Sequence, residues 1–197
     1  MTKRIQALQK KLKELHLDAA MIYDRENLIY FAGIDEVEGG ALAVPAEGEP
    51  ELFCLWLEAD HVRQACEIEK VTGFVFPQKN QSIMMAEWLK ARNWKAPRIG
   101  FTRYFISLND YLCLRDAAPD MKVCDLATVC YQLRSVKDEG EIEKMRMAGK
   151  ALAAGMQAAI DCVKPGMMEV EVLAEAEYAM TRAGSQGSSF RMQVLTH

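Results

Sequence analysis

The feature that most limits the possible folds is an alternation of short apolar runs with amphipathic segments over residues 19–124. Apolar runs that end at Gly, Pro or Asp are typical of buried strands, whereas apolar residues spaced three and four apart indicate helices. The pattern predicts strands at 19–23, 27–31, 41–44, 51–57, 71–76, 98–101 and 121–124, and helices at 1–17, 59–67, 82–93 and 107–117. Such interleaving predicts an α/β fold with a mixed sheet flanked by helices.

One pair of these strands is predicted to form a hairpin. The polar, turn-rich segment Pro45-Ala-Glu-Gly-Glu-Pro50 separates the runs 41–44 and 51–57. Gly and Pro in a short polar link between two strand-like runs are typical of a hairpin connection.

The pattern becomes helical after residue 125, with helices predicted at 125–133, 138–163 and 169–183 and a strand at 188–196. Asp138 and Glu141 have the spacing of a capping box, and Pro165 with Gly166 ends the long helix. One face of this helix carries an apolar stripe that comprises Ile142, Met145, Ala148, Leu152, Met156, Ala159 and Val163.

A domain boundary is predicted near residues 134–137, which gives domains at 1–134 and 135–197. The second segment is too short to bury two helix stripes, and a lone strand has no pairing partner. It is therefore expected to pack on the first domain or on another chain, or to be a truncated piece of a larger domain.

The charge balance argues against a nucleic-acid or membrane partner. The 197 residues carry 24 Lys and Arg against 28 Asp and Glu, a net charge of -4, with no basic cluster. No apolar run approaches the roughly 20 residues that cross a bilayer. Six cysteines without a Cys-x-x-Cys pair favour reduced thiols and a cytoplasmic location.

Local motifs identify no catalytic centre. The sequence has no Gly-rich phosphate loop and no Gly-x-Ser-x-Gly elbow, and its three histidines have no second ligand at metal-binding spacing. Cys54 and His61 are a conceivable nucleophilic pair. Glu171 and Glu175 lie one helical turn apart, but a solvated acidic face explains them better than a metal site.

Several segments together resemble the creatinase, prolidase and aminopeptidase P family. Arg134 and Lys137 form an Arg-x-x-Lys step before a capped helix whose residues 141–148 read Glu-Ile-x-x-Met-Arg-x-Ala. The segments Leu17-Asp-Ala-Ala-Met-Ile-Tyr-Asp24 and Asn27-Leu-Ile-Tyr-Phe-Ala-Gly33 are similar to the opening of the family's N-terminal domain. The resemblance spans nearly the whole chain.

The resemblance implies a creatinase-like N-terminal α/β domain followed by an incomplete α+β pita-bread segment. It implies a metal-dependent Xaa-Pro peptidase, with two divalent ions (Mn, Co or Zn) in the full-length protein, a peptide or small-molecule substrate, and a homodimer. The family's metal ligands lie on later strands, so no residue of this chain is assigned a metal role and the chain alone is expected to be inactive.

The N-terminal domain of such enzymes often overhangs the active site of a partner subunit. The resemblance therefore makes Tyr30, Glu36 and Glu38 candidates for the rim of the substrate cleft, where the acids would favour substrates with a positive group. A solvated acidic loop is the simpler interpretation of the two acids. Two other functions remain open: a metal-free creatinase-type C–N hydrolase, and a non-catalytic binding or oligomerisation module.

Overall fold

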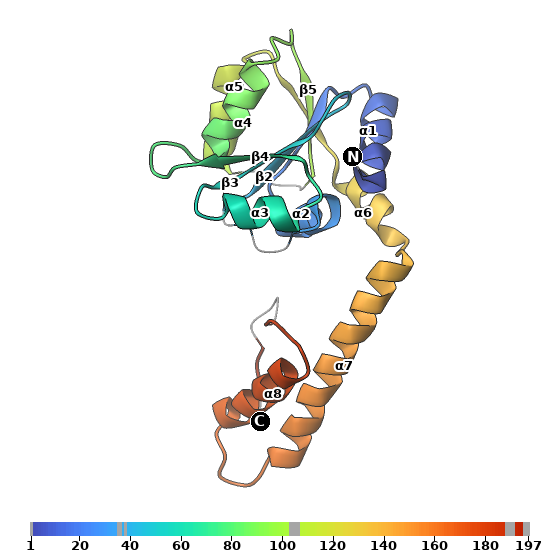
Figure 1. Ribbon diagram of the computed structural model, residues 1–197, viewed down its shortest axis with the longest axis vertical. Coiled ribbons are helices and arrows are strands. Elements are labelled where there is room, and N and C mark those ends of the chain that lie inside the picture. Colours follow the sequence, from blue (N-terminus) through green and yellow to red (C-terminus); the bar gives the residue numbers. More distant parts are fainter. Residues whose placement is uncertain (1, 35–36, 38, 103–106, 188–191, 195–197) are drawn as a thin grey trace. The chain divides into compact units, whose positions relative to one another are not determined.

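The computed structural model describes residues 2–34, 37, 39–102, 107–187 and 192–194. The chain divides into two compact units, residues 1–136 and 137–197 (Figure 1). Each unit has its own set of internal contacts.

The first unit is built on a six-stranded sheet with the order β4-β3-β2-β1-β5-β6. Strand β2 runs antiparallel to its neighbours β1 and β3, and every other pairing is parallel. The strands are β1 Ala19–Ile22, β2 Ala41–Pro45, β3 Glu51–Leu55, β4 Lys70–Phe74, β5 Arg98–Phe101 and β6 Lys122–Asp125. The predicted mixed sheet and the predicted hairpin, formed by β2 and β3, are both confirmed.

Helices cover both faces of this sheet (Figure 1). One face packs against α1 Lys3–Glu14, α2 Arg25–Ala32, α3 Ala59–Ala65 and α6 Ala127–Ser135 through a core that includes Leu8, Phe31, Val62 and Leu126. The other face packs against α4 Gln81–Lys90 and α5 Leu108–Ala117 through Met85, Trp88 and Leu114, among others. The sheet is thus the middle layer of three, because both of its faces are apolar.

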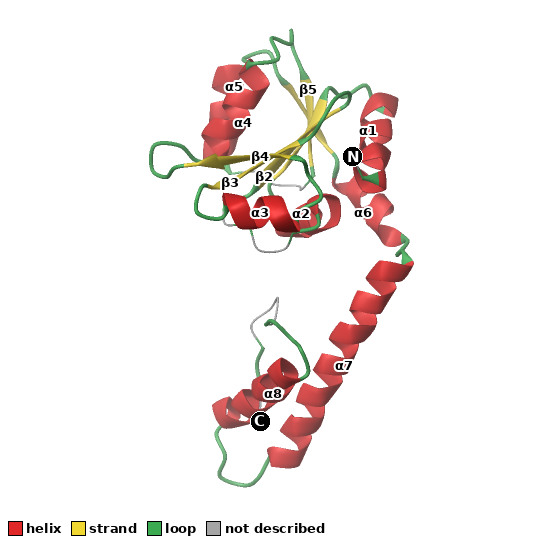
Figure 2. Cartoon of the chain, viewed as in Figure 1, coloured by secondary structure: helices red, strands yellow, loops and turns green. Residues whose placement is uncertain are grey.

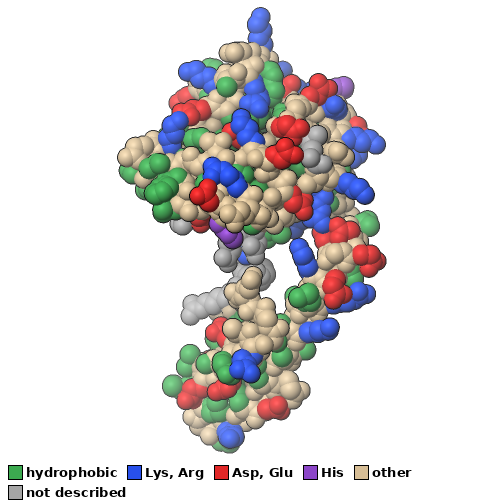
Figure 3. All heavy atoms as spheres, in the orientation of Figure 1, with side chains coloured by type: hydrophobic (Ala, Val, Ile, Leu, Met, Phe, Trp, Pro, Cys, Tyr) green, Lys and Arg blue, Asp and Glu red, His purple; other side chains and the backbone are tan. Residues whose placement is uncertain are grey.

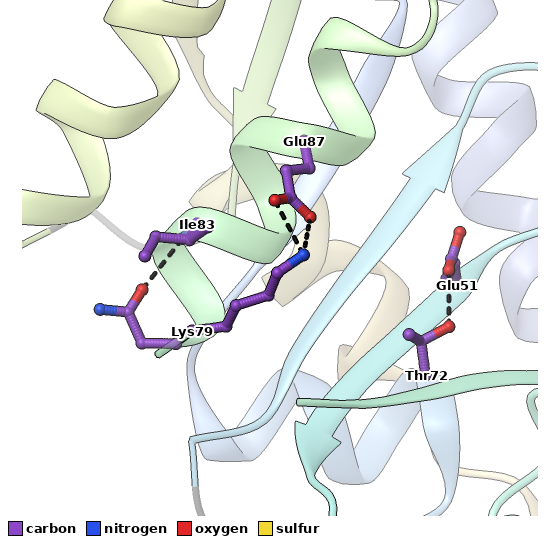
Figure 4. A network of polar contacts seen from close by, with 6 residues as sticks. Glu51, Thr72, Lys79, Ile83 and Glu87 are labelled. Carbon is purple, nitrogen blue, oxygen red and sulfur yellow. Dashed lines mark hydrogen bonds and ion pairs between the residues drawn. The ribbon is translucent and has the colours of Figure 1, made fainter. Parts of the chain in front are cut away.

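A buried carboxylate joins the edge strand β4 to β3. Glu51 accepts a hydrogen bond of 2.8 Å from the hydroxyl of Thr72 and pairs with the Lys70 ammonium at 2.8 Å. Figure 4 shows the Glu51–Thr72 contact, together with the ion pair between Lys79 and Glu87 beside α4. The cross-strand contacts satisfy a carboxylate that is itself only 8% exposed.

The expectation of a strand at 27–31 is wrong, because these residues belong to helix α2. The side chain of Asp24 caps the helix by accepting from the Asn27 backbone N–H, and Gly33 ends it in the left-handed region at φ 74°. Leu28, Phe31 and Ala32 are buried at the three- and four-residue spacing of a helix face. The capping residues at both ends therefore favour a helix over the strand that the short apolar run suggests.

The second unit contains the helices α7 Glu139–Cys162 and α8 Glu169–Arg182 (Figure 2). Asp138 and Glu141 form the predicted capping box at the start of α7. The two helices pack closely at Gly155, where a Cβ atom would lie 2.4 Å from Cγ of Met180. Most of the predicted strand at 188–196 lies outside the described residues.

The apolar stripe of α7 faces away from this contact. Met145, Leu152, Met156 and Val163 are all about 60% exposed, whereas the buried positions of α7 are Ala151 and Gly155. Helix α8 therefore packs on the small residues beside the stripe. Within the described part of this unit, nothing covers the larger apolar side chains.

Candidate functional site: a pocket at the carboxyl ends of β1 and β5

A pocket of the first unit lies at the point in the sheet where the order in which the strands are added reverses. From β1 the chain adds β2, β3 and β4 on one side, and then returns to add β5 and β6 on the other. Open α/β sheets bind ligands at such a point, beyond the carboxyl ends of the strands. Tyr23 and Asp24 follow β1, and Thr102 follows β5, at the edge of a pocket of about 370 Å³.

The walls of this pocket are mostly apolar, with polar groups at a few points. Met21, Leu28, Ile34, Val37 and Phe101 supply the apolar surface. The polar lining residues are Tyr23, Asp24, Arg25, Gln81, Thr102, Ser107 and Asp110. An apolar cleft with a few polar groups that face one another is the usual form of a small-molecule site.

Asp24 anchors one wall of the pocket. One of its oxygens accepts from the Thr102 hydroxyl at 2.6 Å, and the other accepts from the side-chain amide of Asn27 at 2.8 Å and from its backbone N–H at 3.2 Å. The same carboxylate therefore caps α2 and ties the end of β1 to the end of β5. It is 8% exposed.

Asp110 of α5 is a second buried carboxylate in the pocket lining, and it contacts Ser82 of α4. The hydroxyls of Ser82 and Ser107 each donate to one of its carboxylate oxygens. The side-chain amide of Asn109 donates in turn to the Ser82 hydroxyl at 2.9 Å. This network fixes the carboxylate, which is 6% exposed, beside the pocket.

Tyr23 also lines the pocket and carries an unsatisfied hydroxyl. Its oxygen is buried and has no hydrogen-bond partner among the described residues. Burial raises the pKa of Tyr23 well above its ordinary value, and the negative charge of Asp110 and the nearby Cys113 add to the effect. The phenol therefore stays neutral at physiological pH and can both donate and accept a hydrogen bond.

The described residues support neither a thiol nucleophile nor a metal centre. Burial raises the pKa of Cys54 to about 11, so the conceivable Cys54/His61 pair would lack a thiolate at neutral pH. No group of three or more His, Cys, Asp or Glu among the described residues could hold a metal ion. The metal centre implied by the family therefore does not fit the part of the chain described by the structure.

Other surface features also bear on partners. On the face drawn in Figure 3, Lys and Arg side chains of the first unit are interspersed with Asp and Glu, so that face has no basic patch for phosphates. None of the helices in the described ranges is both long enough and apolar enough to span a bilayer.

The predicted cleft residues are only partly described. The hydroxyl of Tyr30 donates to the backbone oxygen of Leu133 in α6 at 2.8 Å, and the Arg4 guanidinium lies 4.5 Å from the ring centre. These contacts hold α2 against α1 and α6. Glu36 and Glu38 lie outside the described residues, although Ile34, Val37 and Gly39 of the same segment line the pocket.

Sequence reasoning missed Tyr23, Asp24, Thr102 and Asp110 as members of one site. The available signal was positional, because polar residues directly follow two apolar runs, 19–22 and 98–101. Sequence alone did not show that these strands are adjacent, since β1 and β5 are separated by three intervening strands along the chain.

Comparisons with known protein families match both units. The family model described as Creatinase/Prolidase N-terminal domain matches residues 4–136. The model described as Metallopeptidase family M24 matches residues 143–197.

Curated relatives align with nearly the whole chain. A putative dipeptidase, YkvY, of Bacillus subtilis (strain 168) is 30% identical over 98% of this chain and 53% of its own length. An ectoine hydrolase of Halomonas elongata is 22% identical over 93% of this chain and 48% of its own length. The chain thus spans about half the length of these relatives.

Solved structures show the same fold. A prolidase from Pyrococcus furiosus has a TM-score of 0.79 and 24% identity, over 92% of this chain and 54% of the other. An X-Pro aminopeptidase from Thermotoga maritima has a TM-score of 0.77 and 24% identity, over 94% of this chain and 51% of the other. The expected fold, a creatinase-like α/β domain followed by the start of a pita-bread domain, is confirmed. The chain belongs to the creatinase/prolidase family, with its N-terminal domain over residues 4–136 and the opening of an M24 metallopeptidase domain over residues 143–197.

Proposed function

We propose that this chain forms the N-terminal part of a metal-dependent peptidase that cleaves Xaa-Pro peptides. The observation that carries the proposal is the match of both units, in order, to the two halves of one peptidase architecture. A relative named putative dipeptidase and solved structures named prolidase and X-Pro aminopeptidase support the same reaction.

The proposal divides the work between the domains expected at 1–134 and 135–197. The first shapes the substrate cleft and contributes to subunit contacts in a cytoplasmic homodimer. The second opens the peptidase domain, whose two divalent ions (Mn, Co or Zn) would polarise the peptide bond. Ligands for those ions would come from residues outside the described part of this chain, because the described residues offer no such group. Tyr30, Glu36 and Glu38 remain the proposed rim of the cleft.

A direct assay tests the proposed reaction. The 197-residue chain, and the same chain continued through the rest of the peptidase domain, are each incubated with Mn²⁺ or Co²⁺ and an Xaa-Pro dipeptide. We expect hydrolysis by the longer protein and none by the 197-residue chain. Absence of hydrolysis by the longer protein, with metal bound, would contradict the peptidase assignment.

The cleft rim is tested in the longer protein. Replacing Glu36 and Glu38 with Gln should weaken the preference for substrates that carry a positive group, because two negative charges are removed. Glu49→Gln is the matched control, since Glu49 is an exposed acid in the β2–β3 turn. If all these variants keep the same ratio of kcat/KM values for cationic and neutral substrates, the two acids have no role in selection.

A second candidate is a metal-free C–N hydrolase of the creatinase type. It is favoured by the alignment with an ectoine hydrolase, whose name indicates a substrate other than a peptide. Activity on a small guanidino or ammonium compound that persists after complete removal of metal would select this alternative.

A further inference from the structure

We propose that the pocket between the carboxyl ends of β1 and β5 binds a small organic cation with a primary ammonium group and an apolar body. This site belongs to the first unit alone. It goes beyond the peptidase function and does not depend on it.

Two acidic side chains give the walls of the pocket a negative charge. Asp24 and Asp110 are both more than nine-tenths buried and both line the pocket. Their hydrogen bonds come from hydroxyl, amide and backbone N–H groups, all of which are neutral. No Lys, Arg or His of the described residues forms an ion pair with either carboxylate.

Both carboxylates have unused hydrogen-bonding capacity. Two carboxylate groups offer about eight lone-pair sites. Three are used at Asp24 and two at Asp110. An ammonium group has three N–H donors and no acceptor, which matches a pocket where acceptors are in excess.

Tyr23 adds a polar group that is independent of the carboxylates. The Tyr23 hydroxyl is buried beside the pocket without a partner among the described residues. A buried polar group that lacks a hydrogen bond costs about 1–3 kcal/mol, so a ligand that satisfies it gains affinity. The phenol oxygen can accept one N–H of the same ammonium group.

The rest of the pocket defines the other end of the ligand. Met21, Leu28 and Phe101 contribute apolar surface to the lining, and the volume of about 370 Å³ is within the usual range for a small molecule. Arg25 also lines the pocket, but its side chain is exposed and it has an interaction of its own. An anionic ligand would meet two buried carboxylates and is therefore disfavoured.

Three probes with one skeleton and different charges test the proposal on the 197-residue chain. Phenylbutylammonium, phenylbutanol and phenylbutyrate are titrated separately into ¹⁵N-labelled protein and followed by two-dimensional NMR. We expect the ammonium compound to bind about tenfold more tightly than the alcohol, because its hydrogen bonds are charge-assisted, and the carboxylate to bind least. Shifts should centre on Tyr23, Phe101 and Thr102.

Variants separate a specific site from general attraction to an acidic protein. Asp110→Asn keeps the shape of the side chain but removes its charge. It should lower the affinity for the ammonium compound to about the affinity for the alcohol. Tyr23→Phe should weaken ammonium binding several-fold with little effect on the alcohol. Asp120→Asn, which removes an exposed charge outside the pocket, should change neither affinity.

Three results would each overturn the proposal: equal affinity for the three probes, tighter binding of phenylbutyrate, or NMR shifts confined to residues outside the pocket. If Asp110→Asn does not fold, the comparison of Tyr23→Phe with the parent chain decides the question. Added salt should then weaken binding of the ammonium compound but not of the alcohol in the parent chain. An ammonium affinity that is unchanged in Tyr23→Phe and independent of salt would refute the site.

Discussion

Replacing Gly100 with Ala tests how closely β5 approaches the layer that contains α6. Gly100 lies in the middle of β5, and a Cβ atom there would come within 2.2 Å of Cδ1 and 2.6 Å of Cγ of Leu126. Leu126 is fully buried, and Leu17 closes the space beside it, with its Cδ1 atom 3.2 Å from the added carbon. The new methyl group therefore has no free volume.

The magnitude follows from this geometry. Carbon atoms in contact prefer separations of about 3.5–4.0 Å, so Leu126 must move by more than about 1 Å. Overpacking of this kind costs about 1–3 kcal/mol, and the reduced flexibility of Ala in a strand returns about 0.5–1 kcal/mol. We expect the free energy of unfolding to fall by roughly 1–2 kcal/mol.

A double-mutant cycle isolates the contact. Leu126→Ala alone should cost about 2–5 kcal/mol because it leaves a cavity. In that background Gly100→Ala should cost nothing or should stabilise, since the clashing atoms are gone, which gives a coupling energy of about 1–3 kcal/mol. The cycle therefore predicts that the two substitutions together cost less than the sum of their separate costs.

Urea denaturation followed by tryptophan fluorescence measures these energies. All three tryptophans, Trp56, Trp88 and Trp94, lie in the first unit, so the signal reports on that unit. The slope of the transition should stay the same if only stability changes. An equal cost of Gly100→Ala in both backgrounds would refute the packing of Leu126 over β5.

Three further predictions concern packing, the Tyr30 contact and pH. Gly155→Val should speed amide hydrogen exchange in α8, because a Cβ at position 155 would lie 2.4 Å from Cγ of Met180. Unchanged exchange rates in α8 would contradict this packing. Tyr30→Phe should lower the free energy of unfolding by about 1 kcal/mol through loss of the bond to Leu133, and unaltered stability would argue against that bond. Burial raises the pKa values of Cys54 and Cys130 to about 11 and about 12, from 9.0, so the thiols favour folding below pH 9 and this contribution is lost as pH rises toward 12. Replacing both by Ala should flatten the fall in stability measured by urea denaturation above pH 9, and an identical pH profile would count against the burial argument.

Much of the first unit could be predicted because its signals are local. Short apolar runs correctly predict the strands β1 and β5, and the polar link 45–50 correctly predicts the hairpin. The pattern wrongly predicts a strand at 27–31 because Asn27-Leu-Ile-Tyr-Phe31 is short and apolar, whereas the caps at Asp24 and Gly33 determine helix α2. The spacing of apolar residues over only five positions does not distinguish a strand from a helix.

The pocket could not be predicted because it depends on contacts far apart in the chain. Asp24 and Thr102 are 78 residues apart in sequence and become neighbours only through the pairing of β1 with β5. Asp110 and Ser82 come from different helices. The apolar stripe of α7 was visible in the sequence, but its exposure follows from α8 packing on Gly155 instead.

The central proposal is that this chain supplies the front part of a metallopeptidase whose ions would be held by residues outside the described part of the chain. Measuring bound Mn²⁺ by elemental analysis, alongside hydrolysis of an Xaa-Pro dipeptide, tests it most directly. For the 197-residue chain the account predicts no stoichiometric metal and no turnover, and for the chain continued through the peptidase domain it predicts both. Two tightly held ions and turnover in the 197-residue chain would contradict it.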